Sequence, residues 1–105
     1  MRTFPRSLAQ FRDIVRGRGE QLRGLSFGEI VELTESPTEH IAVASRSATI
    51  SLIVEPQPDG SVRVVVQGFM KHRIMPGASV ALDGFYKHPD GRVSAMLDRE
   101  LYAYD

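Results

Sequence analysis

The spacing of the apolar residues changes near residue 40, and this change constrains the fold more than any other feature. Before it, apolar residues recur every three or four positions, as on one face of a helix. They are Phe4, Leu8, Phe11 and Val15. From His40 onward, apolar residues alternate with polar or small ones and β-branched side chains dominate. The sequence therefore predicts a helical N-terminal third followed by a sheet.

The first helix is expected at residues 4–16. Pro5 suits the first turn, where its missing N–H costs nothing. Gly17 and Gly19 follow the last apolar residue of the periodic segment and are expected to end the helix.

A second helix is expected at residues 27–34. Ser26 and Glu29 match a capping box, in which each side chain accepts a hydrogen bond from the backbone N–H of the other residue. Pro37 limits the helix, because the residue before a proline is pushed out of the helical region.

The alternating segments predict the strands. They lie at residues 41–44, 50–55, 62–67, 80–83 and 93–98, with a last short apolar stretch at 101–104. Residues 45–47 form either a bulge or a turn, so residues 40–55 are either one bulged strand or two.

Two predicted turns have the same tripeptide sequence, Pro58-Asp59-Gly60 and Pro89-Asp90-Gly91. Proline presets φ for the first corner of a turn and glycine accepts the left-handed conformation that closes a hairpin. The strands on each side of both turns should therefore pair antiparallel. The whole chain, residues 1–105, is expected to form one α+β domain, with two N-terminal helices packed on one face of a four- to five-stranded antiparallel meander sheet.

Charge is balanced overall but not locally. Thirteen basic residues match thirteen acidic ones, yet residues 1–23 carry a net charge of +4 and residues 24–39 a net charge of −4. The arginine-rich first helix could contact an anion such as a nucleic acid backbone, or it could lie beside the acidic segment as an ordinary solvated surface. The zero total excludes a uniformly basic nucleic acid binder.

Several chemistries find no support in the sequence. The chain has no cysteine, which excludes thiol catalysis and a disulfide framework. His40, His72 and His88 lack the spacing of a metal pair, and no serine lies in a Gly-x-Ser-x-Gly elbow. We therefore expect no metal and no cofactor, and an enzyme is not the favoured hypothesis.

One carboxylate could still serve a ligand pocket between the helices and the sheet. Asp83 is the acidic residue within an apolar strand, where burial would raise its pKa, although alternation with Leu82 would instead turn it to solvent on the outer face. The candidate pocket residues are His72, Asp83, Tyr86 and His88.

The outer face of the sheet is the more informative surface. The residues expected to face the helices are Val62, Val64, Val66, Val80, Leu82, Val93, Ala95 and Leu97. That assignment turns five large apolar residues outward: Ile53, Val65, Phe69, Phe85 and Met96. Such a patch needs a cover, which could be a second copy, another protein, an apolar ligand or the chain's own residues 101–104.

These observations favour a small protein–protein interaction module that forms a homodimer through the outer sheet face. The alternative is a small-molecule-binding protein or small enzyme, and the third hypothesis is the anion contact of the first helix. The absence of a long apolar run and of an apolar N-terminal stretch predicts a protein without membrane contact. The absence of cysteine fits a cytoplasmic location, which we expect. Eleven arginines against two lysines point to a bacterial origin.

Overall fold

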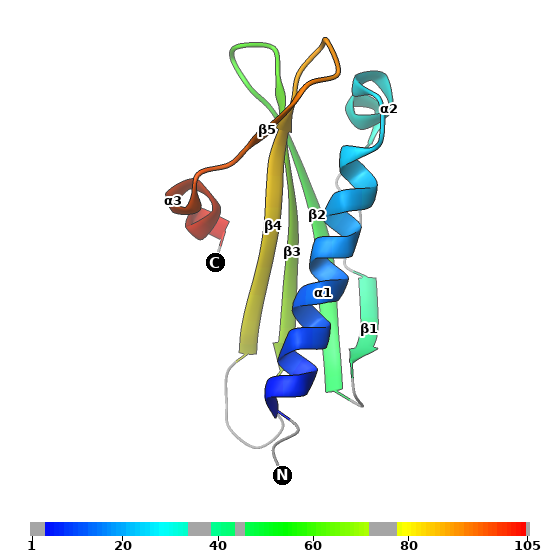
Figure 1. Ribbon diagram of the computed structural model, residues 1–105, viewed down its shortest axis with the longest axis vertical. Coiled ribbons are helices and arrows are strands. Elements are labelled where there is room, and N and C mark those ends of the chain that lie inside the picture. The colour runs from blue at the N-terminus through cyan, green and yellow to red at the C-terminus, as the bar shows by residue number, and fades with distance from the viewer. Residues whose placement is uncertain (1–3, 34–38, 44–45, 72–77, 105) are drawn as a thin grey trace.

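The fold is a long helix on one face of a five-stranded antiparallel meander (Figure 1). The computed structural model describes residues 4–33, 39–43, 46–71 and 78–104. The strands follow the chain in the order β1-β2-β3-β4-β5. Their bounds are Glu39–Val43, Arg46–Pro56, Val62–Lys71, Ala78–Lys87 and Val93–Ala95. The α+β class and the antiparallel meander are therefore confirmed.

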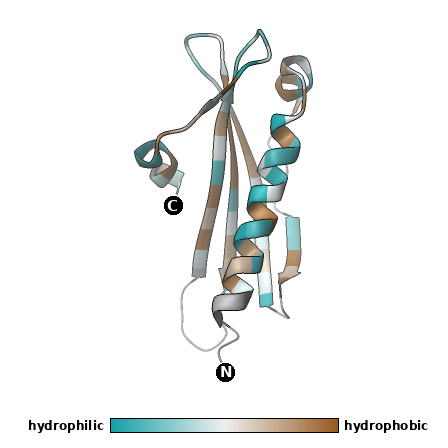
Figure 2. Ribbon diagram, viewed as in Figure 1, coloured by the Kyte–Doolittle hydropathy of each residue, from teal (hydrophilic) through white to brown (hydrophobic). Residues whose placement is uncertain are grey.

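Helix α1 spans Phe4–Arg23 and ends seven residues beyond its predicted limit. The expectation that Gly17 and Gly19 end the helix is wrong. A side chain at position 19 would place its Cβ 1.7 Å from a carboxylate oxygen of Asp83, so glycine here lets the helix continue close to β4. The amphipathic banding of α1 is visible in Figure 2.

Helix α2 spans Phe27–Glu32 and ends two residues before its predicted limit. Its capping box is confirmed. Ser26 N–H donates to Glu29 Oε1 at 2.9 Å, and Glu29 N–H donates to Ser26 Oγ at 3.1 Å. Pro37 lies outside the described residues.

The segment at residues 40–55 forms two strands. β1 and β2 pair antiparallel from Glu39 opposite Ile50 to Val43 opposite Arg46. Both predicted hairpins are present, and their glycines have positive φ, 92° at Gly60 and 91° at Gly91.

The core lies between α1, α2 and one face of the sheet. Phe11 and Val15 of α1 pack over Gly68 of β3, where an added Cβ would meet both side chains at 2.8 Å. Ile30 of α2 packs with Val62, Val64 and Phe85, at the end of the sheet where the β2–β3 and β4–β5 hairpins lie. Both clusters are formed by residues that lie far apart in the sequence.

The sequence assigns the faces of β3 correctly and those of β4 incorrectly. Val66 pairs with Asp83 and Val64 with Phe85, so the odd-numbered residues of β4 share the helix-facing side. Phe85 is therefore a core residue, 1% exposed, and not part of the outer face. Val80 and Leu82 lie on the outer face instead. The register can take this form because Asp83, turned toward the helices, pairs with Arg23.

The C-terminal segment folds back over the outer face. α3 spans Asp98–Leu101 and continues into the 3-10 turn η1 at Tyr102–Tyr104, so residues 101–104 form helical turns and not a strand. A Cβ on Gly84 would lie 2.5 Å from Met96 Sδ and 3.1 Å from Leu101 Cδ1. Because Gly84 has no side chain, Met96 and Leu101 can pack directly against β4 at this point.

Candidate functional site: the open edge of strand β4

Strand β4 is paired along its full length on one side and along only three residues on the other. All ten of its residues pair with β3. β5 pairs only with Phe85, Tyr86 and Lys87. Among the described residues, no strand lies beside β4 before Phe85, so most of this long strand is an open sheet edge.

The direction of the backbone groups on this edge follows from the neighbouring hairpin. His88 N–H donates to Arg92 O at 2.9 Å, toward β5. Because the direction of the backbone groups repeats every second residue along an antiparallel strand, Val80, Leu82 and Gly84 direct N–H and C=O to the same side. Arg23 Nη2 reaches Gly84 O on this side at 3.3 Å. The polar backbone groups of Val80 and Leu82 therefore face outward from the sheet edge.

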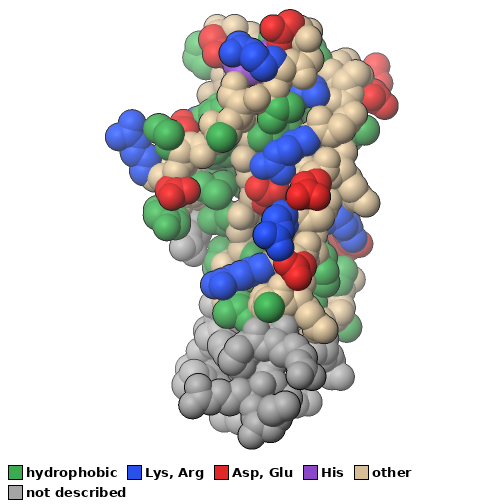
Figure 3. Space-filling view, viewed as in Figure 1, with side chains coloured by type: hydrophobic (Ala, Val, Ile, Leu, Met, Phe, Trp, Pro, Cys, Tyr) green, Lys and Arg blue, Asp and Glu red, His purple; other side chains and the backbone are tan. Residues whose placement is uncertain are grey.

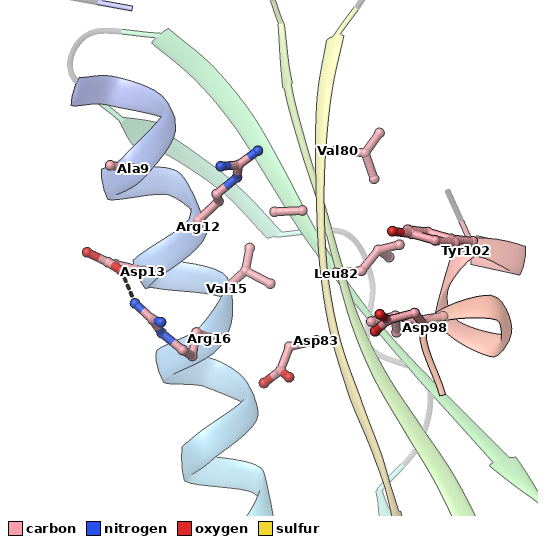
Figure 4. Close-up of a pocket in the computed structure, with 12 residues that line it drawn as sticks. Ala9, Arg12, Asp13, Val15, Arg16, Val80, Leu82, Asp83, Asp98 and Tyr102 are labelled. Atoms are coloured by element: carbon pink, nitrogen blue, oxygen red, sulfur yellow. Dashed lines mark hydrogen bonds and ion pairs between the residues drawn. The ribbon is translucent and has the colours of Figure 1, made fainter. Parts of the chain in front are cut away.

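A groove of about 560 Å³ surrounds this edge. Figure 4 shows β4 at its floor, with α1 on one side and α3 on the other. Val80 and Leu82 lie on the α3 side of the strand, and Asp83 lies on the α1 side. The groove thus exposes backbone donors and acceptors between two walls of different chemistry.

The α1 wall is charged. Arg12, Asp13 and Arg16 line it, and Arg16 pairs with Asp13. Arg12 extends from α1 toward β4 (Figure 4) and forms no ion pair with any described residue. Figure 3 shows basic and acidic side chains interleaved on this side of the molecule. The wall therefore offers both signs of charge within two helical turns.

The α3 wall is amphipathic. Leu101 and Tyr102 lie beside the aliphatic side chains of β4, and Asp98 adds one carboxylate. Tyr102 is 68% exposed, which is high for a large ring. An extended segment in the groove would cover it.

Asp83 and Arg23 join α1 to β4 at the end of the groove nearer the β4–β5 hairpin. Arg23 Nη1 and Nη2 donate to the two carboxylate oxygens of Asp83 at 2.7 and 3.0 Å, and the guanidinium lies 4.9 Å from the centre of the Phe85 ring. Lys87 Nζ donates to Arg23 O at 3.1 Å. Asp83 is thus held in an ion pair, which holds this end of the wall in place.

A polar network on the outer face holds the C-terminal segment. Arg63 donates to the hydroxyl of Tyr86 at 2.9 Å and to that of Tyr104 at 3.1 Å. The two hydroxyls donate in turn to Glu100 and Glu55. Burial raises the pKa of both tyrosines, and the hydrogen bonds to the carboxylates raise it further. The Tyr86 hydroxyl also lowers the pKa of Glu100. The network fixes α3, and with it the second wall of the groove.

The residues proposed for a ligand pocket are not brought together. Asp83 and Tyr86 lie on opposite faces of the sheet. His88 Nε2 forms a 2.5 Å hydrogen bond with Ser94 Oγ at the β4–β5 hairpin. His72 lies outside the described residues.

The residues proposed for an outer interface separate into two groups. Val65 is 0% exposed and Met96 9% exposed within the single chain, and Phe85 faces the helices. Ile53 is partly exposed and Phe69 is 37% exposed. The described C-terminal segment thus covers part of the patch, and dimerisation through what remains stays a prediction.

Sequence reasoning missed the open edge because it did not predict the lengths of the paired strands. One signal was present: β4 has no lysine or proline between Ser79 and Gly84, although such residues commonly protect an exposed edge. The opposite edge strand, β1, is short and begins with the exposed pair Glu39 and His40, and Glu39 forms a bidentate pair with Arg18.

No helix in the described ranges has the length and apolarity to cross a membrane. No group of acidic residues and histidines there could hold a metal ion. Comparisons with protein-family models, curated proteins and solved structures gave no match.

Proposed function

We propose that this chain is a protein-interaction module that accepts an extended segment as an additional strand beside β4. The observation that carries the proposal is the open edge at Val80–Gly84, which forms the floor of a groove between α1 and α3. Strand addition of this kind draws affinity from main-chain hydrogen bonds and specificity from alternating side chains.

The two walls define what the added segment needs. On the α3 side, its side chains meet Val80, Leu82 and the exposed ring of Tyr102, which favours apolar residues at alternate positions. On the α1 side they meet charges of both signs, with Arg12 available to a carboxylate. The preferred segment therefore alternates apolar residues with polar or acidic ones.

The test is selection of a random-peptide display library on the folded chain. Val80→Pro removes one outward N–H from the open edge and leaves the bonds to β3 in place, because those bonds use the odd-numbered residues. Val80→Ala is the matched control, since it shortens the side chain and keeps the N–H. Circular dichroism first establishes that each variant is folded.

We expect peptides with alternating apolar residues to be enriched, to bind the Val80→Ala variant, and to lose at least about tenfold in affinity for the Val80→Pro variant, consistent with one lost hydrogen bond and a steric block. Leu82→Pro provides a second test of the same edge. Selected peptides that bind both proline variants as tightly as wild type would contradict the proposal.

A further inference from the structure

We infer that the strand added at this edge is β4 of a second copy of the chain, antiparallel to the first, with Ala81 at the two-fold axis. The inference rests on the proposed function and names the occupant of the same groove. It joins two five-stranded sheets into one continuous sheet.

The backbone of the open edge is self-complementary in this register. Val80 and Leu82 direct their N–H and C=O groups outward, and two antiparallel copies place Val80 of one opposite Leu82 of the other. Each such pair can exchange two hydrogen bonds, and Ala81 then faces Ala81 of the second copy as a non-hydrogen-bonded pair. One rotation therefore satisfies the outward groups of Val80 and Leu82 in both copies.

The side chains agree with this pairing on both faces. On the outer face, Val80 and Leu82 of the two copies form one aliphatic cluster, bordered by Tyr102 and Leu101. Cross-strand aliphatic pairs of this kind stabilise antiparallel sheets. On the helix-facing side the residue at the axis is alanine, the smallest side chain with a Cβ, so it leaves room between the two α1 helices.

The charges also permit two copies to meet. The two-fold axis sets the α1 helices antiparallel, so that Asp13 of each copy can approach Arg12 or Arg16 of the other. The groove's charged residues have nearly balanced signs. They are Arg12, Asp13, Arg16, Asp83 and Asp98. The chain's net charge of zero adds no long-range repulsion between copies.

Cysteine cross-linking tests the register, because the chain has no cysteine of its own. In a non-hydrogen-bonded antiparallel pair the two Cα atoms lie about 4.5 Å apart, within the range that a disulfide spans. Ala81 is only 7% exposed in the single chain. This burial disfavours a disulfide formed through random collision of two copies of the Ala81→Cys variant. Ala42→Cys is the matched control on β1, the opposite edge strand, where Ala42 is exposed.

The experiment combines mild oxidation of both cysteine variants with sedimentation of the wild type and the Val80→Pro variant. We expect wild type at twice the 11.7 kDa chain mass, a shift of Val80→Pro toward monomer, and a disulfide-linked dimer for Ala81→Cys but not for Ala42→Cys. The sedimentation results do not depend on the folding of either cysteine variant.

Three outcomes would overturn the inference. A wild type that remains monomeric at millimolar concentration excludes the second copy as occupant. A dimer that persists in Val80→Pro uses another surface. Cross-linking of Ala42→Cys alone places the contact at β1. In the first case, library peptides that lose affinity for Val80→Pro would still support the proposed function, so the two failures are distinguishable.

Discussion

Adding a methyl group at Gly68 should destabilise the chain by forcing α1 away from the sheet. A Cβ at this position would lie 2.8 Å from Phe11 Cζ and 2.8 Å from Val15 Cγ2, both on fully buried side chains. Overpacking of this kind costs about 1–3 kcal/mol. Replacing a strand glycine with alanine also lowers the conformational entropy cost of folding, which offsets about 0.5–1 kcal/mol of that loss. From the middles of these two ranges, the net loss in the free energy of unfolding is about 1 kcal/mol.

Thermal unfolding followed by circular dichroism measures this loss. In a domain of this size each kcal/mol corresponds to a fall in Tm of about 4–8 °C. Gly17→Ala is the matched control, because no atom lies within 4 Å of its added Cβ and alanine is the better helix former. We expect Gly17→Ala to raise the Tm.

A double variant tests the mechanism. Val15→Ala makes room beside the new methyl group, so Gly68→Ala combined with Val15→Ala should be less destabilised than the sum of the two single changes. A Gly68→Ala variant as stable as wild type, or strict additivity with Val15→Ala, would refute the packing of α1 over β3 described above.

The remaining predictions concern the anchors of the two groove walls. Asp83→Asn weakens the two-bond ion pair to α1 and should lower the Tm measurably, whereas Asp90→Asn, in an exposed 3.9 Å pair, should change stability by no more than about 0.5 kcal/mol in denaturant unfolding. Tyr104→Phe removes hydroxyl bonds of the outer network and should cost about 1–2 kcal/mol, while Tyr102→Phe, at an exposed ring, should cost little. Because the pKa of Tyr104 is raised above 10.0 in the folded chain, its contribution is complete below pH 10 and is lost as the pH rises through the folded pKa. Unfolding titrations from pH 8 to 11.5 should therefore show a smaller alkaline loss in Tyr104→Phe, and equal losses would contradict the network.

Local signals predicted the parts of the fold that depend on local physics. Ser26 and Glu29 cap α2 as expected, and both hairpins close at a glycine with positive φ. Those features depend on hydrogen bonds and φ preferences within a few residues, which the sequence displays directly.

The errors arose where distant residues decide the outcome. Glycines such as Gly17 and Gly19 commonly mark the end of a helix. In this chain α1 continues past them to Arg23, because this part of the helix packs against β4. The register of β4 depends on Arg23, which compensates Asp83 on the helix-facing side and so permits Phe85 to enter the core. The open edge depends on where the pairing of β5 with β4 ends. A single sequence carries no comparable signal for the point at which two paired strands separate.

Hydrogen exchange of individual β4 amides is the most direct test of strand addition. Val80 and Leu82 N–H point to the open edge, whereas Ala81 N–H points to β3 and serves as the internal reference. The account predicts that protection of Val80 and Leu82 rises with protein concentration or with a selected peptide, while that of Ala81 changes far less. Exchange of Val80 and Leu82 at the rate of unstructured amides under all these conditions would contradict it.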